Sequence, residues 1–172
     1  DSRIATLYEG TTGIQALDLV GRKVLIDKFK QLNVFTGEML SFAGQFLPWK
    51  KSPQAKQMRK QAWTVAKLAI KWRYLAYRMA MRAKKNPDNV GASSVDFLMY
   101  SGYAYMGFMW AKMSFAAHKQ LAAGGGDKNF LESKLHSAEF FFERILPRAD
   151  AHAKTLSANL ESLMAMPTSY FE

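Results

Sequence analysis

The sequence lacks cysteine and is poor in residues that interrupt regular structure. Without cysteine among its 172 residues, the chain can form neither a disulfide nor a thiolate metal site. Five prolines and 11 glycines are few for this length, and their scarcity favours long regular elements. No segment alternates polar and apolar residues over the length of a strand. The chain is therefore not a disulfide-stabilised scaffold, and helices are its expected regular elements.

Acidic residues and familiar catalytic motifs are also scarce. The chain has 14 Asp and Glu against 24 Lys and Arg, a formal net charge of +10, which favours a polyanionic partner. It contains no Gly-x-Ser-x-Gly motif and no phosphate-binding loop. His118, His136 and His152 are too far apart in sequence to suggest metal ligands, so no metal site is predicted. Residues 1–30 have no apolar core of a signal peptide.

Hydrophobic periodicity predicts an all-α fold, an antiparallel up-and-down bundle of about four long helices. The expected helices cover about residues 13–47, 53–86, 93–122 and 128–164. We expect interruptions near Gly21 or Thr36-Gly37 in the first and at Pro147 in the last, with Ser93-Ser94 starting the third and Asp127 capping the fourth. One apolar stripe marks the second helix: Met58, Ala62, Val65, Ala69, Trp72, Ala76, Met79 and Ala83.

The third expected helix contains an uncharged run, FLMYSGYAYMGFMWA, between Asp96 and Lys112. Its 15 residues are fewer than the roughly 20 that a membrane span needs, so we interpret it as the central, buried helix of the bundle. A ligand channel lined by Met and aromatic side chains is an alternative interpretation. Gly102 and Gly107 are expected to let neighbouring helices approach closely.

The second expected helix carries half of the basic residues, and residues 50–85 include no acidic one. Four interpretations are open: a solvated face balanced by other helices, a surface for anionic lipid or another acidic partner, a nucleic-acid site, or a site for a phosphate-bearing ligand. The nucleic-acid interpretation has the least support, because a helix this long matches no groove-reading motif. At 100° per residue, seven of the basic residues share one arc around Tyr74: Lys56, Lys60, Lys67, Lys71, Arg78, Arg82 and Lys85.

The N-terminal stretch YEGTTGIQALDLVGR admits two interpretations. Glu9 before a helix interacts well with the helix dipole, and Gly10 with Thr11 or Thr12 would make an ordinary helix start. The stretch also resembles the acyl-CoA dehydrogenase family, whose pattern is Tyr-Glu-Gly-Thr, two variable residues, then Ile-Gln. Asp1-Ser2-Arg3-Ile4 resembles the family's lead-in. Six residues fill the pattern itself: Tyr8, Glu9, Gly10, Thr11, Ile14 and Gln15.

This resemblance implies an FAD-dependent enzyme that oxidises the α,β bond of an acyl-CoA thioester. In the family's roles, Glu9 is the catalytic base, Thr11 and Gln15 bind FAD, and Tyr8 and Gly10 border the substrate. It divides the chain into residues 1–30, the end of the catalytic helical domain, and residues 31–172, a helical-bundle extension similar to that of longer, mostly bacterial members. We therefore expect a C-terminal fragment of a longer protein, inactive alone.

The resemblance also implies the partners: an acyl-CoA substrate, an electron-transfer flavoprotein as electron acceptor, and further copies in a homo-oligomer. The expected location is the cytoplasm, with peripheral contact to an anionic membrane surface as an extension of the basic-helix interpretation. The alternative function is a basic helical module that binds such a membrane surface or a protein partner and has no catalytic role. In that case YEGT is only a helix cap.

Overall fold

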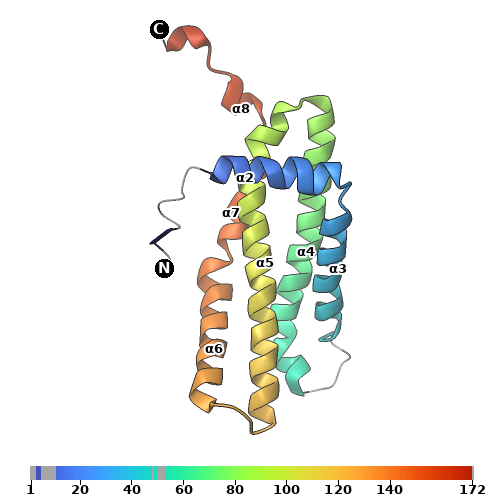
Figure 1. Cartoon of the computed structure of the whole chain (residues 1–172), viewed down its shortest axis with the longest axis vertical. Coiled ribbons are helices and arrows are strands. Elements are labelled where there is room, and N and C mark those ends of the chain that lie inside the picture. The colour runs from blue at the N-terminus through green and yellow to red at the C-terminus, as the bar shows by residue number, and fades with distance from the viewer. Residues whose placement is uncertain (1–2, 5–10, 48, 50–52, 172) are drawn as a thin grey trace.

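Helices are the regular elements in the part of the chain that the computed structural model describes, residues 3–4, 11–47, 49 and 53–171. The bundle has four layers, each a single helix or consecutive helices in line, that run alternately down and up (Figure 1). A further helix lies across one end of them. The predicted all-α, up-and-down bundle is therefore confirmed. The layers are α3 (Lys30–Gly44), α4 (Pro53–Lys85), α5 (Asp88–Ala122), and α6 (Lys128–Phe140) continued by η2 (Phe141–Ile145) and α7 (Arg148–Leu156).

The crossing helix consists of α2 (Thr12–Asp18) and its π-helical continuation η1 (Leu19–Ile26). It lies almost perpendicular to the bundle and packs on α5 (Figure 1). Two short elements, α8 (Glu161–Met164) and η3 (Thr168–Tyr170), carry the described C-terminus beyond the same end. This end of the molecule therefore brings the crossing helix close to the C-terminal elements.

The core lies where α4 packs between α3 and α5. The predicted apolar stripe of α4 is buried from Met58 to Met79, and only Ala83 at its end is partly exposed. From α5, Phe97 and Tyr100 are fully buried, and the Tyr100 hydroxyl donates to the Leu68 carbonyl at 3.1 Å. This burial raises the pKa of Tyr100. The 3.6-residue period of the sequence thus identified the core face of α4.

The expected interruption of the first helix was wrong in position. The chain turns not at Gly21 or Thr36-Gly37 but at Lys28 and Phe29, whose φ angles are 53° and 63°. Non-glycine residues adopt this left-handed conformation only at a cost, so surrounding contacts must compensate. Here the Phe29 ring lies against Tyr77 at 4.3 Å between centroids, and the Asp27 carboxylate accepts from the Gln31 backbone N–H at 2.8 Å. The turn sends the chain from η1 into α3.

The expected start of the third helix was also wrong. α5 begins at Asp88, five residues before Ser93, and Pro87 occupies its N-cap position. Asn86 supplies the capping contact, because its side-chain oxygen accepts from the Asp88 backbone N–H at 2.9 Å. Pro87, next to Asn86, lies in the short connection between α4 and α5. The two helices pack against each other as an antiparallel pair.

In the last layer, the observed cap and break agree with those predicted from the sequence. Asp127 caps α6 as predicted, accepting from the backbone N–H groups of Asn129 and Phe130 at 2.9 and 3.3 Å. Pro147 marks the predicted break, with the π-helical turn η2 before it and α7 after it. The layer is therefore two helices with a bend rather than one continuous helix.

The glycines of α5 differ in their surroundings. A Cβ at Gly107 would lie 3.3 Å from Leu68 and 3.4 Å from Leu146, so the expected close approach is confirmed there. A Cβ at Gly102 would meet no atom of the described residues within 4 Å, so the expectation was wrong for Gly102. None of the described helices is both long and apolar enough to span a membrane.

Candidate functional site

The motif stretch lies at the beginning of the described chain. Tyr8, Glu9 and Gly10 fall outside the described residues, and Thr11 and Gln15 fall within them. Thr11 occupies the N-cap position of α2 with φ −98° and ψ −5°, and its side chain makes no capping hydrogen bond. The helix start that the sequence predicted near Thr11 or Thr12 is therefore present.

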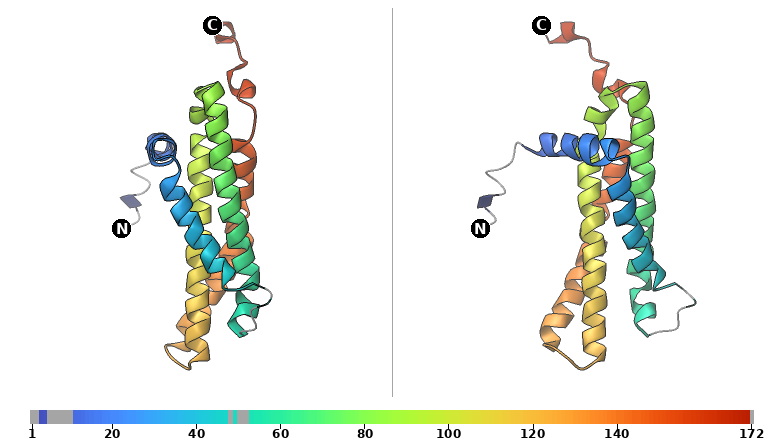
Figure 2. Two further views of the ribbon diagram at one scale, coloured as in Figure 1. Left: turned by 90° about the vertical axis from the view of Figure 1, so that its right-hand side faces the viewer. Right: turned by 45° about the vertical axis from the view of Figure 1, so that its right-hand side comes forward.

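α2 presents two different faces. Ala16 and, one turn later, Val20 of η1 are fully buried against the bundle. Ile14 and Leu17 are 68% and 48% exposed, and Gln15 is exposed too. Figure 2 shows α2 on the opposite side of α5 from α7, standing out from the layers. The described motif residues Ile14 and Gln15 are thus held on the side of α2 that the bundle does not use.

The basic arc of α4 lies at the surface, and part of it faces the last layer. Lys60 and Lys71 pair with carboxylates of the last layer, Glu143 at 3.3 Å and Asp150 at 2.6 Å. Arg78 and Arg82 donate to the backbone carbonyls of residues 156–158 at the C-terminal end of α7. Cations are favourable there, because those carbonyls have no partner within the helix. Four of the seven arc residues therefore connect α4 to the last layer, and two of them, Lys60 and Lys71, have the acidic partners that the balanced-face interpretation expected.

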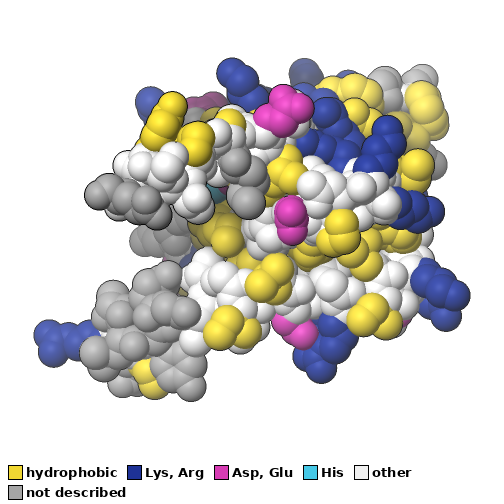
Figure 3. Space-filling view, turned by 90° about the horizontal axis from the view of Figure 1, so that it is seen from above, with side chains coloured by type: hydrophobic (Ala, Val, Ile, Leu, Met, Phe, Trp, Pro, Cys, Tyr) yellow, Lys and Arg dark blue, Asp and Glu magenta, His cyan; other side chains and the backbone are white. Residues whose placement is uncertain are grey.

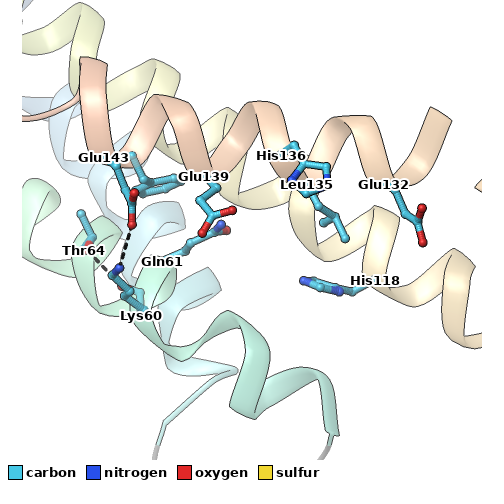
Figure 4. A pocket seen from close by; sticks show the side chains of 10 residues that line it. Lys60, Gln61, Thr64, His118, Glu132, Leu135, His136, Glu139 and Glu143 are labelled. Atoms are coloured by element: carbon cyan, nitrogen blue, oxygen red, sulfur yellow. Dashed lines mark hydrogen bonds and ion pairs between the residues drawn. The ribbon is translucent and has the colours of Figure 1, made fainter. Parts of the chain in front are cut away.

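A pocket of about 460 Å³ opens between α4, α5 and α6 (Figure 4). Its lining combines cationic, amide, imidazole and carboxylate groups: Lys60, Gln61, Thr64, His118, Glu132, Leu135, His136, Glu139, Phe142 and Glu143. In Figure 4 the three glutamates project from one side and Lys60, Gln61 and His118 from the other. Sequence reasoning missed this pocket, because its residues come from three separate helices. Within the described ranges, no three His, Asp or Glu side chains are placed to hold a metal ion.

The histidines occupy different environments. His152 lies on α7 with its Nδ1 2.8 Å from the Asp96 carboxylate of α5, and its ring stacks on Tyr103 at 5.7 Å between centroids. His118 and His136 both line the pocket. The sequence places His152 and Asp96 56 residues apart, so no local spacing could have indicated their contact. This contact links α5 to α7.

Burial lowers the pKa of His118 from its usual 6.5. Between the folded and unfolded pKa values the unfolded chain binds the extra proton, so the free energy of unfolding should fall as the pH drops below about 6.5. We expect the His118 ring to titrate below pH 6.5 in an NMR titration, and the variant His118→Gln to lose this part of the pH dependence of stability. A His118 titration above pH 6.5 would contradict the prediction.

The chain is similar to known proteins over most of its length. The family model described as "Acetyl-CoA dehydrogenase C-terminal like" matches residues 31–167. The 3-methylmercaptopropionyl-CoA dehydrogenase of Ruegeria pomeroyi is 34% identical over 164 residues, which are 95% of this chain and 27% of that protein. The broad-specificity linear acyl-CoA dehydrogenase FadE5 of Mycobacterium tuberculosis is 33% identical over 155 residues, 86% of this chain and 24% of that protein.

These matches define the class of protein: a helical C-terminal region of an acyl-CoA dehydrogenase. The chain belongs to the family of acetyl-CoA dehydrogenase C-terminal-like domains, as the match over most of its length shows. It spans about a quarter of the length of the two curated relatives. The resemblance found in YEGTTGIQ is thereby confirmed at the level of the family.

Proposed function

We propose that this chain is part of a longer FAD-dependent acyl-CoA dehydrogenase. Residues 1–30 would end its catalytic helical domain, and residues 31–172 would form the bundle extension. The observation that carries the proposal is the complete motif Tyr-Glu-Gly-Thr-x-x-Ile-Gln, followed by an α2 that keeps Ile14 and Gln15 exposed. The exposed Gln15 amide, on a helix anchored by Ala16, can both donate and accept a hydrogen bond, which is compatible with a role in binding the dinucleotide.

Each motif residue has a chemical role in this proposal. Glu9 removes the proton from the α-carbon of the thioester, and Gly10 lets the backbone come close to the substrate. The Glu9 backbone N–H donates to the thioester carbonyl, where negative charge develops as the proton leaves. Tyr8 borders the acyl pocket, and Thr11 and Gln15 bind the cofactor. Bound FAD supplies the acceptor for the hydride that leaves the β-carbon.

The names of the relatives support a substrate class. One is named for 3-methylmercaptopropionyl-CoA and the other for linear acyl-CoA, and both names denote CoA thioesters with a hydrogen-bearing α-carbon. We propose an acyl-CoA of this kind for the longer protein. An electron-transfer flavoprotein as acceptor, a homo-oligomeric state and a cytoplasmic location belong to the same proposal by family resemblance.

The alternative function, a basic module with no catalytic role, finds less support in the arrangement of α4. Two lysines of its arc pair with carboxylates and two arginines bind carbonyl groups at the surface, so four of the seven arc residues already have partners in the last layer. Peripheral contact with a membrane can be tested by pelleting with anionic and neutral vesicles. Equal, salt-insensitive binding to both would exclude an electrostatic membrane contact.

The direct test compares the longer protein with the 172-residue chain. We expect the purified longer protein to carry FAD, seen in its flavin absorbance, and to reduce an artificial electron acceptor when an acyl-CoA is added. The 172-residue chain should do neither, because a complete flavin and thioester site needs more chain than the described helices provide. Bound flavin or acyl-CoA oxidation in the short chain would contradict the proposed division, and a flavin-free longer protein would contradict the proposed function.

A further inference from the structure

Between Asp96 and Lys112, α5 is uncharged on all sides but is not buried on all sides. A helix with apolar residues around its whole circumference is typical of a position enclosed by other elements. α4, α2, α6 and α7 all pack on α5. Phe97, Ala104 and Ala111 are completely buried on its inner side. The opposite side of α5 nevertheless remains open.

That open side carries a continuous line of apolar residues, the α5 stripe. Its members follow one another at helical spacings of three, four or seven residues, which places them on one face. Four are between 37% and 45% exposed, and the glycine among them is exposed as well. The α5 stripe consists of Val95, Met99, Gly102, Met106 and Met113.

Gly102 gives the stripe a shape suited to a packing partner. Because a Cβ there would meet no described atom within 4 Å, the backbone of α5 is accessible at this point between the Met99 and Met106 side chains. A helix or chain segment could approach α5 closely at Gly102 and pack between the two methionines. The flexible thioethers adapt to such a partner and would otherwise leave apolar surface in water.

One end of the stripe lies near the crossing helix. α2 passes over α5 near one end of the stripe, and its N-terminal end projects beyond α5 on the side away from α4 (Figure 1). The exposed Leu17 of α2 and the first turn of α5 share a pocket of about 420 Å³. Figure 3, which looks onto this end, shows scattered hydrophobic side chains beside Lys and Arg, with few acidic ones. The α5 stripe therefore begins close to the corner where the exposed side of α2 meets α5.

We propose that the α5 stripe docks against the catalytic part of the same longer chain. The inference rests on the proposed function, because α2 in that proposal holds Thr11 and Gln15 toward the cofactor. A body that contacts Ile14 and Gln15 on the outer side of α2 would lie beside the corner that α2 forms with α5. The relatives supply the necessary length, since about three quarters of each lies outside the matched region. Docking there would fix the bundle relative to the site on α2.

A photo-crosslinking experiment in the longer protein tests this docking. Met106 is replaced by p-benzoylphenylalanine, and a matched protein carries the same probe at Thr155, an exposed residue of α7 on the far side of α5 from α2. Chains of two isotopic compositions are mixed before irradiation, so that products within one chain and between chains differ in mass. We expect the Met106 probe to crosslink, within its own chain, to peptides outside residues 11–171, and the Thr155 probe to give none of these products.

The remaining outcomes would overturn the inference. Crosslinks between isotopically different chains, including any to residues 95–113 of a second copy, would assign the stripe to an interface between copies. Equal products from both probes, or no products, would mean that the stripe faces solvent. Flavin content and turnover of the unmodified protein are measured separately. A Met106 crosslink in a flavin-free protein would leave the docking intact while the proposed function fails.

Discussion

The variant Glu9→Gln of the longer protein is expected to lose turnover of acyl-CoA while keeping its FAD. Glutamine has nearly the same shape as glutamate, but its neutral amide cannot accept the α-proton at neutral pH. General base catalysis typically contributes about 10²–10⁴-fold to a rate, and the loss should be at least of that size. The measurement is the steady-state rate with a saturating acyl-CoA, together with the flavin absorbance of each purified protein.

The same chemical change at another glutamate provides the control. Glu38 is an exposed residue of α3, so Glu38→Gln should keep both turnover and flavin. A Glu9→Gln variant that turns over like the parent would place the base elsewhere. A variant that loses FAD as well would mean that Glu9 supports cofactor binding rather than proton transfer alone.

Periodicity and motif spacing were sufficient for the class of fold and for the family. The stripe of α4 has a 3.6-residue period over nearly its whole length, so its buried face could be predicted without any knowledge of its neighbours. Asp127 and Pro147 act through their own backbone neighbourhood, and the structure places both where the sequence did. The motif around Glu9 identified the family through six residues at fixed spacing, which a helix cap alone would not require.

Element boundaries that depend on distant contacts could not be predicted in this way. The turn at Lys28 and Phe29 contains neither glycine nor proline, and its left-handed backbone is supported by Phe29 packing on Tyr77, 48 positions later in the chain. α5 begins at Asp88, whose backbone N–H donates to the Asn86 side chain, whereas the serine pair at Ser93 looked like the stronger signal. Local propensity is overridden wherever packing supplies more free energy.

The contacts made by surface residues were the hardest features to predict from the sequence. The basic arc of α4 suggested an anionic partner, but Lys71 and Arg82 reach residues 79 and 74–76 positions away in the last layer. Conversely, α5 looked like a helix buried on all sides, and one of its faces is open. Charge pattern and hydrophobicity identify what a face can contact, and only the arrangement of the helices tells which contacts the fold already uses.

Among changes to the bundle, Phe97→Ala is expected to destabilise the chain most clearly. Phe97 is completely buried on the inner side of α5, in the cluster that contains Tyr100 and the α4 stripe. Truncation removes the transfer free energy of the ring and leaves a cavity that a rigid bundle cannot fully close. The free energy of unfolding should fall by about 3–5 kcal/mol, a large part of the roughly 5–15 kcal/mol typical of a domain.

Urea unfolding followed by circular dichroism measures this loss, and Phe140→Ala is the matched control. Phe140 ends α6 and is 60% exposed, so the same truncation there leaves no cavity and should change the free energy of unfolding by no more than about 0.5 kcal/mol. A similar midpoint for both variants would contradict the position of Phe97 in the core. A selective loss in Phe97→Ala would instead show that α5 is held by its inner face, leaving its opposite face free for a partner.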